Sequence, residues 1–535
     1  MSLVEDSSSP RPTPLLSGFF WGGLVVSYLF TRLFAIFGIP VFIDEAIHID
    51  WAHPSIHTFL PVDPSYDGKW LSIRLFALVT RLPIADHVVA ARLSVSILGL
   101  TAAVAIYLIG RDLFSRVAGA ASAILYVVLP FTLIYNSLAL ADSVQLAFGT
   151  WAVFAAVRVT RSARWMFAAI ALPFLLVATI LSKFSAIGFA ILPALSLLLL
   201  MRPAEWRRGL LRIAPAVIVA LGLVAWLGKH GMLEVFKTKA SSSWREMTAL
   251  AWQNLFVAGA WLWGLLTPSI AILAIVSLGW LLVQNNRGPR FITGLLCLTV
   301  LPVLLAARVW YPRYLLLSVV PIVLAIGGAA GSVVAQISNR SHRPIAGTIL
   351  AAVLGVVVVW PIARSGFVLF DLPDANLPEL EQWQLVSGWP SGYGMAELVS
   401  YLREQAQATP GGITVARTIF NDHPLHTLNV YLAGTQSLSL FTLGDDNPNH
   451  VAELARLSTE RRVLFVLLTD NGAPEHIRDP ALPLLKCGTQ IWSYTRPKGT
   501  SGLIVYELRC DENQIKSLTT TNKTANQGRV AFRPV

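Results

Sequence analysis

Long runs of apolar residues, separated by short polar stretches, dominate the chain up to about residue 365. A run of about 20 apolar residues is long enough to cross a bilayer as a helix. The pattern predicts about eleven spans. They cover residues 15–37, 88–109, 117–135, 143–157, 165–181, 185–201, 210–227, 265–283, 291–307, 314–335 and 345–363.

After residue 365 the pattern changes to short apolar segments separated by Pro, Asp, Asn and Gly. The segments ITVART, SLSLFTL, RVLFVLLTD, TQIWSYT and GLIVYELR are typical of strands, and MAELVSYLREQA and VAELARLSTERR of helices. Strands that alternate with helices predict a small α/β domain with some parallel pairing. We therefore expect a polar tail at 1–14, a membrane domain at 15–365, an α/β domain at 366–510 and a disordered tail at 511–535.

Composition supports a polytopic helical membrane protein. Of 535 residues, 55% are hydrophobic and 13% charged, and the mean hydropathy is +0.61, whereas soluble domains carry about 25% charged residues. The net charge of +11 does not indicate nucleic-acid binding, because no basic run is interleaved with aromatic residues. The three cysteines, Cys297, Cys487 and Cys510, exclude a disulfide-framework protein, and no Cys/His spacing fits zinc.

Arginine residues are concentrated in alternate short loops, which predicts that these loops are cytoplasmic. They are Arg111 and Arg116; Arg158, Arg161 and Arg164; Arg202, Arg207 and Arg208; Arg287 and Arg290; and Arg340 and Arg343. The N-terminus is then cytoplasmic and the C-terminal domain extracytoplasmic, in a multi-pass protein of the cell membrane. A disulfide between Cys487 and Cys510 would be permitted in that oxidising compartment.

Two further segments are predicted to lie in the membrane interface. GKWLSIRLFALVTRLP, at residues 68–83, is too short and too charged to span. Residues 243–263 carry four tryptophans, which prefer that depth.

Acidic residues stand at two predicted outer membrane boundaries. Asp44 and Glu45 follow the first span, and Asp142 interrupts apolar sequence near the start of the fourth. Buried acids at such depth are costly unless water, a cation or a reaction requires them. Two simpler readings remain open: a solvated loop for the pair, and a first-turn helix acid for Asp142.

Basic residues occur at the same predicted face. They are Lys69, Arg92, Lys183, Arg308 and Arg313. Snorkelling to lipid phosphates explains most of them, but Lys183 lies between two apolar segments. An aromatic belt alone would explain Trp310, Tyr311 and Tyr314.

The order of these segments resembles a known superfamily. DE follows the first span, then come DGK, ARLSVSILGLTAAVAIYLIGRDLF, LPFTLIYNSLALADS, LSKFSAIG and PRYLLLSVVP. This resembles the GT-C glycosyltransferases that use a polyprenyl-phosphate-linked sugar, especially the protein O-mannosyltransferase and aminoarabinose-transferase group. The resemblance covers about residues 15–365 and implies a GT-C-like bundle of about eleven transmembrane helices.

The resemblance also implies roles for individual residues. Asp44 is the expected catalytic carboxylate, Glu45 its neighbour, and Asp142 the second acidic position. The residues expected at the donor phosphate are Lys69, Lys183, Arg313 and Tyr314.

The sequence departs from the family pattern at two places. His48 stands where many relatives have Tyr, and Trp70-Leu71 replaces the usual prolines. The acceptor, whether protein, lipid or glycan, therefore stays open.

The expected chemistry is compatible with these residues. A carboxylate can take the proton of the attacking hydroxyl and stabilise positive charge on the sugar ring. Fixed cations can stabilise the leaving phosphate, and direct displacement predicts inversion at C1. No metal is required, although Asp44, Glu45 and Asp142 could hold a divalent cation.

Two alternatives belong to other functional classes. One is a transporter or flippase of lipid-linked sugars, for which broken helices and internal symmetry would be expected; neither is evident in the sequence. The other is a membrane scaffold whose outer domain binds a partner, which leaves the acidic and basic residues unexplained.

Overall fold

The computed structural model describes residues 14–52, 67–232, 244–284, 286–338, 343–419, 422–444, 450–470, 482–499 and 501–515. The predicted N-terminal tail, up to residue 13, and the predicted C-terminal tail, from residue 516, lie outside these ranges. The chain divides into two compact units, described separately below. The first comprises Met1–Gly38, Val62–Ser72 and Arg92–Phe370, and the second Ile39–Pro61, Ile73–Ala91 and Asp371–Val535. The predicted bounds of the membrane domain, 15–365, and of the α/β domain, 366–510, stay predictions.

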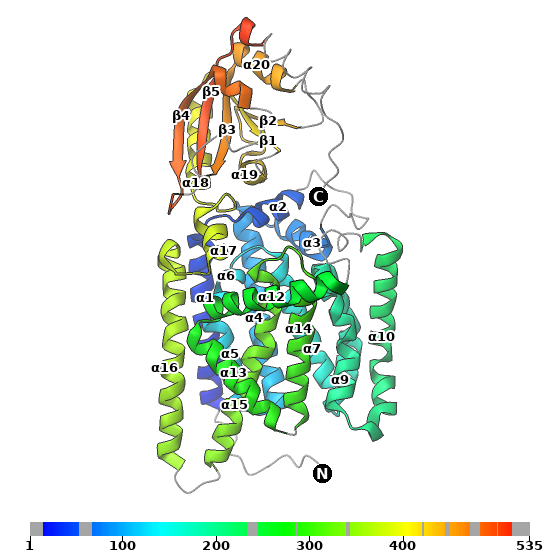
Figure 1. Ribbon diagram of the computed structural model, residues 1–535. Coiled ribbons are helices and arrows are strands. Elements are labelled where there is room, and N and C mark those ends of the chain that lie inside the picture. The colour runs from blue at the N-terminus through cyan, green and yellow to red at the C-terminus, as the bar shows by residue number, and fades with distance from the viewer. Residues whose placement is uncertain are drawn as a thin grey trace. The chain divides into compact units, whose positions relative to one another are not determined.

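The elements of the first unit that the structure describes are all helices (Figure 1). Its elements are α1 (Pro14–Gly38), α4 (His87–Leu113, entering the unit at Arg92), α5 (Arg116–Val128), α6 (Pro130–Tyr135), α7 (Ala141–Arg161), α8 (Met166–Ser182), η3 (Phe184–Ile191), α9 (Leu192–Leu200), η4 (Pro203–Glu205), α10 (Trp206–Lys229), α12 (Trp244–Leu266), α13 (Pro268–Val283), α14 (Arg287–Ala306), η6 (Pro312–Ser318), α15 (Val319–Ser338) and α16 (Arg343–Phe370). Among the described residues, seven helices are long and apolar enough to cross a membrane, and shorter apolar helices accompany them. The predicted polytopic helical class is confirmed, whereas the number of spans stays a prediction.

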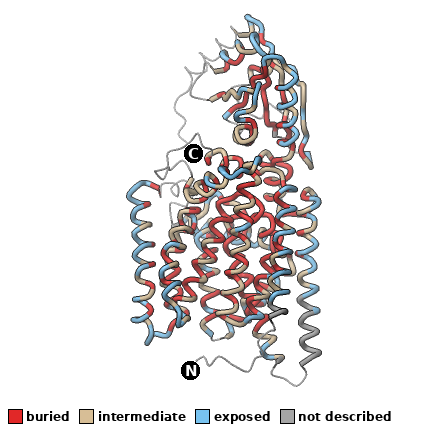
Figure 2. The backbone as a smooth tube through the Cα atoms, turned by 180° about the vertical axis from the view of Figure 1, so that it is seen from behind, coloured by how far each residue is buried: buried red, intermediate tan, exposed pale blue. Residues whose placement is uncertain are grey.

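Burial separates the inner helices of this unit from the outer ones (Figure 2). In the most apolar window of α7, 78% of residues are buried, against 22% in that of α10. The exposed side chains of α10 are themselves apolar, as with Leu211 and Ile218. An apolar outer surface on a helix bundle suits contact with lipid rather than water.

Glycines allow the inner helices to approach closely. A Cβ at Gly110 of α4 would lie 2.8 Å from the Cα of Gly119 in α5, and one at Gly327 of α15 would collide with Ser122 and with the backbone of Ala118. Small residues at such crossings are the usual basis of helix packing in membranes.

A break between α5 and α6 exposes backbone carbonyls that side chains then satisfy. Pro130 has no N–H, so the last carbonyls of α5 lack helical partners. Thr132 donates to Tyr126 O, Arg32 to Val127 O at 2.7 Å, and Ser365 Oγ to Val128 O at 2.9 Å. Arg32, which is 1% exposed, is therefore explained as the cation that caps a buried helix C-terminus.

The segment predicted to lie in the interface at 243–263 forms α12 from residue 244 on. This helix is long and apolar enough to span, but Figure 1 shows it running across the neighbouring α13 and α14 rather than alongside them. Its Trp252 and Trp263 are exposed, in agreement with the interfacial interpretation.

The second unit contains a mixed five-stranded sheet. Its strands are β1 (Ile413–Thr418), β2 (Leu438–Leu443), β3 (Arg462–Asp470), β4 (Gly488–Thr495) and β5 (Ser501–Leu508), in the order β2-β1-β3-β5-β4. β1 pairs in parallel with β2 and β3, and β5 pairs antiparallel with β3 and β4. The other elements are α2 (Ile43–Trp51), α3 (Trp70–Val79, entering the unit at Ile73), η7 (Leu372–Asp374), α17 (Glu379–Gln382), η8 (Trp383–Ser387), α18 (Met395–Ala408), α19 (Asp422–Leu432), α20 (His450–Glu460) and η10 (Leu482–Cys487). The predicted α/β domain with parallel pairing is confirmed.

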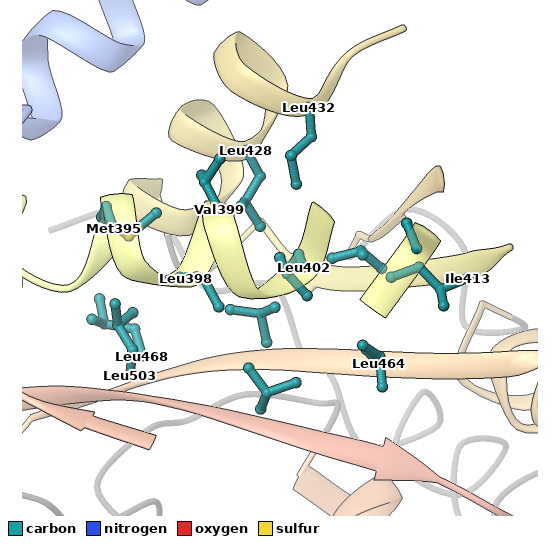
Figure 3. Packing of buried hydrophobic residues seen from close by; sticks show 14 residues of the cluster. Met395, Leu398, Val399, Leu402, Ile413, Leu428, Leu432, Leu464, Leu468 and Leu503 are labelled. Carbon is teal, nitrogen blue, oxygen red and sulfur yellow. The ribbon is translucent and has the colours of Figure 1, made fainter. Parts of the chain in front are cut away.

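Alternating residues of β3 build a core on each face of this sheet, as the two-residue period of a strand requires. Leu464, Val466 and Leu468 point toward α18 and α19, whereas Phe465 and Leu467 point toward α20. Figure 3 shows the first of these cores, in which side chains of α18 and α19 meet those of β3 and β5.

The predicted disulfide between Cys487 and Cys510 is confirmed, with a Cα separation of 4.9 Å. It joins the start of β4 to the residues that follow β5.

Candidate active site

Asp142 lies in the first turn of α7 and is 5% exposed. Its position near the helix N-terminus is favourable for a negative charge, as the simpler reading of the sequence expects. However, its two carboxylate oxygens also face two cations. Lys183 Nζ lies 2.6 Å from Oδ1, and Arg313 Nε lies 3.9 Å from Oδ2. Asp142 is therefore part of a buried ionic cluster as well as a first-turn acid.

Lys183 reaches this cluster because the chain stops being helical at that residue. It separates α8 from η3 and adopts an extended conformation, with φ −160° and ψ 122°. Its ammonium group also lies 3.8 Å from the centre of the Tyr314 ring, a cation–π contact. The side chain is 8% exposed, so snorkelling to lipid does not describe it.

Arg313 and Tyr314 enter the same cluster from η6. Pro312 begins this short 3₁₀ helix, and the Arg313 guanidinium stacks 4.3 Å from the centre of the Tyr311 ring. Its side chain is 6% exposed. Stacking and burial hold the guanidinium plane in place, which fixes the direction of its N–H donors.

We name these four residues, Asp142, Lys183, Arg313 and Tyr314, the cationic cluster. It places two positive side chains around one carboxylate. A planar guanidinium and an ammonium in a buried site are suited to a phosphate group, which accepts charge-assisted hydrogen bonds from both.

Lys69 lies on a turn that is tied to the segment carrying Lys183. Phe184 N donates to Gly68 O at 2.9 Å, and Ser72 Oγ donates to Ser182 O at 2.9 Å. Gly68 has φ +72°, and a Cβ there would lie 2.9 Å from the Phe184 ring, so this position requires glycine. Lys69 Nζ itself lies 3.4 Å from Asp67. The structure thus brings the Lys69 turn beside the break at Lys183.

Asp44 and Glu45 belong to the second unit, in the first turn of α2. Glu45 is fully buried, and its Oε2 accepts the backbone N–H of Phe42 at 3.0 Å. This is the carboxylate half of a capping box, so Glu45 has a structural role at the helix start. Asp44, the next residue toward the N-terminus, is half-buried. The expected convergence of Asp44 with Asp142 and Arg313 stays a prediction.

The start of α2 is held by residues that are more than 340 positions away in the sequence. His423 Nε2 donates to Val41 O at 3.0 Å, and Ile43 N donates to Pro390 O at 3.2 Å. A Cβ at Gly392 would collide with the backbone of Val41. Residues 41–43 therefore adjoin both α19 and the loop 388–394.

The far end of α2 is held by α19. Asp50 Oδ2 accepts hydrogen bonds from His426, at 2.7 Å, and from Asn429, at 2.9 Å. The only sequence signal was the spacing of these polar side chains, which lie three residues apart on one helical face of DHPLHTLNVYL.

The loop 388–394 is fixed in turn by Arg496, which is 1% exposed. Its guanidinium donates to Gly388 O at 3.1 Å and to Tyr393 O at 3.2 Å. This loop is therefore held in place where it adjoins the start of α2.

Among the residues that the structure describes, no group of three or more His, Cys, Asp or Glu side chains is arranged to hold a metal ion. The residues that could contribute to a divalent cation site, Asp44, Glu45 and Asp142, stay candidates from sequence only.

Comparison with known proteins supports the sequence-based resemblance. Residues 70–228 match the family described as dolichyl-phosphate-mannose-protein mannosyltransferase, which is less than half of the chain. No curated protein matches the sequence.

Solved structures match over nearly the whole chain. ArnT from Cupriavidus metallidurans bound to undecaprenyl phosphate is 13% identical, with a TM-score of 0.56 over 92% of this chain and 98% of that one. ArnT from the same organism in the apo state is 13% identical, with a TM-score of 0.54 over 95% of this chain and 99% of that one. The resemblance is thus confirmed at the level of the fold: this chain is a multi-pass helical protein with the fold of ArnT.

Proposed function

We propose that the protein is an integral-membrane glycosyltransferase that moves a sugar from a polyprenyl-phosphate donor to an extracytoplasmic acceptor. The observation that carries this proposal is the cationic cluster, in which Lys183 and Arg313 are buried around Asp142. Burial of two cations around one carboxylate is costly, and a phosphate bound beside them would offset part of that cost. The ArnT structure with undecaprenyl phosphate supports a lipid phosphate as that counter-charge.

On the donor side, Arg313 and Lys183 neutralise the phosphate as it leaves C1 of the sugar, and Lys69 adds a third cation from the adjoining turn. Asp142 positions both cations and lowers the repulsion between them while the site is empty.

On the acceptor side, Asp44 is the proposed general base. It takes the proton of the attacking hydroxyl while that oxygen bonds to C1 and the C1–O bond to phosphate breaks, which inverts the configuration at C1. Glu45 orients Asp44 through the cap that it makes at Phe42. The transporter alternative receives no support from the comparisons, whose named activities are those of transferases.

Asp44→Asn is the direct test of the base. A deletion strain is complemented with either the wild-type protein or the variant, and mass spectrometry compares the lipid-linked sugars and glycans of the two strains. Loss of a general base costs about 10²–10⁴-fold in rate, so the donor lipid should accumulate and the product fall below detection. Glu45→Gln should lower the transfer rate less than Asp44→Asn does, and should lower the stability of the protein more. If Asp44→Asn retains full transfer, the proposed base is wrong.

Donor binding is tested separately with Arg313→Gln. Arg308→Gln is the matched control, because Arg308 is an exposed residue of the same unit that pairs with Glu246. Affinity for undecaprenyl phosphate in detergent micelles should fall at least about tenfold in the first variant, from the loss of one charge-assisted contact, and stay unchanged in the second. Equal affinities in all three proteins would refute the phosphate site.

The proposed orientation has the N-terminus in the cytoplasm and the second unit outside, which follows from the loop arginines. Single cysteines at the exposed positions Arg207 and Glu460 test it with an impermeant thiol reagent on intact cells. Glu460→Cys should label and Arg207→Cys should not; the reverse result would invert the proposed topology.

A further inference from the structure

A second polar pocket lies in the first unit, remote from the cationic cluster. Its volume is about 840 Å³, and it is lined by residues from the ends of α4, α7, α9 and α15 and from the starts of α5 and α14. Asp142 is in the first turn of α7 and Arg161 is its last residue. Nineteen residues of helix span about 28 Å, close to the thickness of the hydrocarbon core. The pocket therefore lies at the opposite membrane face from the cluster.

Three arginines from three separate segments line this pocket: Arg161, Arg202 and Arg287. Arg161 is attracted by Asp112 and, less strongly, repelled by Arg287. Their described side-chain hydrogen bonds go to backbone carbonyls only, Arg161 to Leu113 O and Arg287 to Leu200 O, each at 3.4 Å.

The acids nearby are already committed to other groups. Asp112 pairs with Arg111 through Oδ1 at 2.7 Å and with Arg158 through Oδ2 at 3.2 Å. Glu205, which lines the pocket, accepts the backbone N–H of Arg202 at 3.1 Å. Within the described ranges, no carboxylate forms an ion pair with the three arginines of the pocket. The pocket therefore carries positive charge that a bound anion would neutralise.

The backbone around the pocket also favours a phosphate. The start of α14 lines it, and Asn286 provides no side-chain cap there, so the first-turn amides add to the field of the guanidinium groups. Gly288 and Gly331 also line the pocket, and a Cβ at Gly331 would lie 2.7 Å from Ser115 Oγ, so this glycine allows the close packing of α15 against the start of α5.

We propose that this pocket binds the phosphate group of an anionic phospholipid from the leaflet at that face. Guanidinium groups from separate helix ends match phosphate oxygens, and basic pockets between membrane helices bind anionic headgroups on the cytoplasmic side. This site requires neither the sugar donor nor the transfer reaction.

The test uses the full chain in nanodiscs of phosphatidylcholine alone or with phosphatidylglycerol and cardiolipin. The pocket variant is Arg161→Gln/Arg202→Gln/Arg287→Gln. The control variant, Arg164→Gln/Arg207→Gln/Arg208→Gln, removes the same charge from exposed neighbours that do not line the pocket. The readouts are thermal unfolding and the number of lipids retained in native mass spectrometry.

Anionic lipid should raise the unfolding temperature of the wild type and of the control variant, since a ligand that binds only the folded state stabilises it. The pocket variant should lose that shift, with roughly a hundredfold weaker lipid retention.

Inorganic phosphate and pyrophosphate, added to phosphatidylcholine discs, test a soluble source. If they alone reproduce the arginine-dependent shift, the phosphate site stands and the lipid source is refuted. The proposal fails if the pocket and control variants respond alike. Should the pocket variant not fold in phosphatidylcholine, Arg202→Gln replaces it, because no described side-chain bond is lost there.

Discussion

His423 is expected to make the stability of the second unit depend on pH. Burial, reinforced by the nearby charge of Arg496, lowers the pKa of His423 to about 3 from its ordinary value of 6.5. The side chain is neutral in the folded protein, because Nε2 donates to Val41 O while Nδ1 accepts from Thr427. The unfolded chain takes up a proton below pH 6.5, whereas the folded chain does so only near pH 3.

The sign and size of the effect follow from this difference. Stability from His423 is complete above pH 6.5 and is lost as the pH falls toward 3. Each pH unit in that window is worth about 1.36 kcal/mol. Lowering the pH from 7 to 5 should therefore cost about 2 kcal/mol, or about 30-fold in the opening equilibrium.

Hydrogen exchange of the full chain in nanodiscs measures this opening, once intrinsic exchange rates at each pH are corrected. The peptides to follow cover β1 and α19. His423→Gln keeps an amide donor for Val41 O but cannot titrate. Between pH 7 and 5 the protection factors of the wild type should therefore fall about 30-fold, and those of the variant should not show this fall. His450→Gln, in α20 of the same unit, is the control and should behave as the wild type. An identical loss of protection in wild type and His423→Gln would refute the assignment.

Three further predictions concern packing and covalent structure. Ser365→Ala removes the donor to Val128 O and should lower the unfolding free energy of the first unit by about 1–3 kcal/mol; thermal unfolding in nanodiscs should show no such loss for Ser365→Thr. Gly392→Ala forces the loop 388–394 away from Val41 and should reduce transfer in the complementation assay without altering a proposed catalytic side chain. Gly366→Ala, which meets open space, should not reduce it. Cys487→Ser should destabilise the second unit by about 3 kcal/mol, from the entropy of a loop with a 23-residue separation; an unchanged denaturation midpoint would contradict this estimate.

Much of the architecture is encoded locally in the sequence. Apolar runs specify helices because unpaired backbone groups are too costly in a bilayer, so each run must satisfy its own hydrogen bonds. In the same way, the continuous apolar run in RVLFVLLTD is typical of a strand covered on both faces, as β3 is. The place of Asp142 in the first turn of a helix was also readable from the sequence, because it interrupts a local apolar pattern.

Tertiary structure alone decided how these elements meet. The pairing of Asp142 with Lys183 depends on a break in helix geometry at residue 183, for which ILSKFSAIG contains no Pro or Gly at the break itself. The hydrogen bonds of His423 and Asn429 to the α2 segment join residues more than 370 positions apart. No periodicity in the sequence relates these residues. Local patterns set which backbone hydrogen bonds form within a segment, whereas pairing between distant side chains depends on packing that only the folded chain provides.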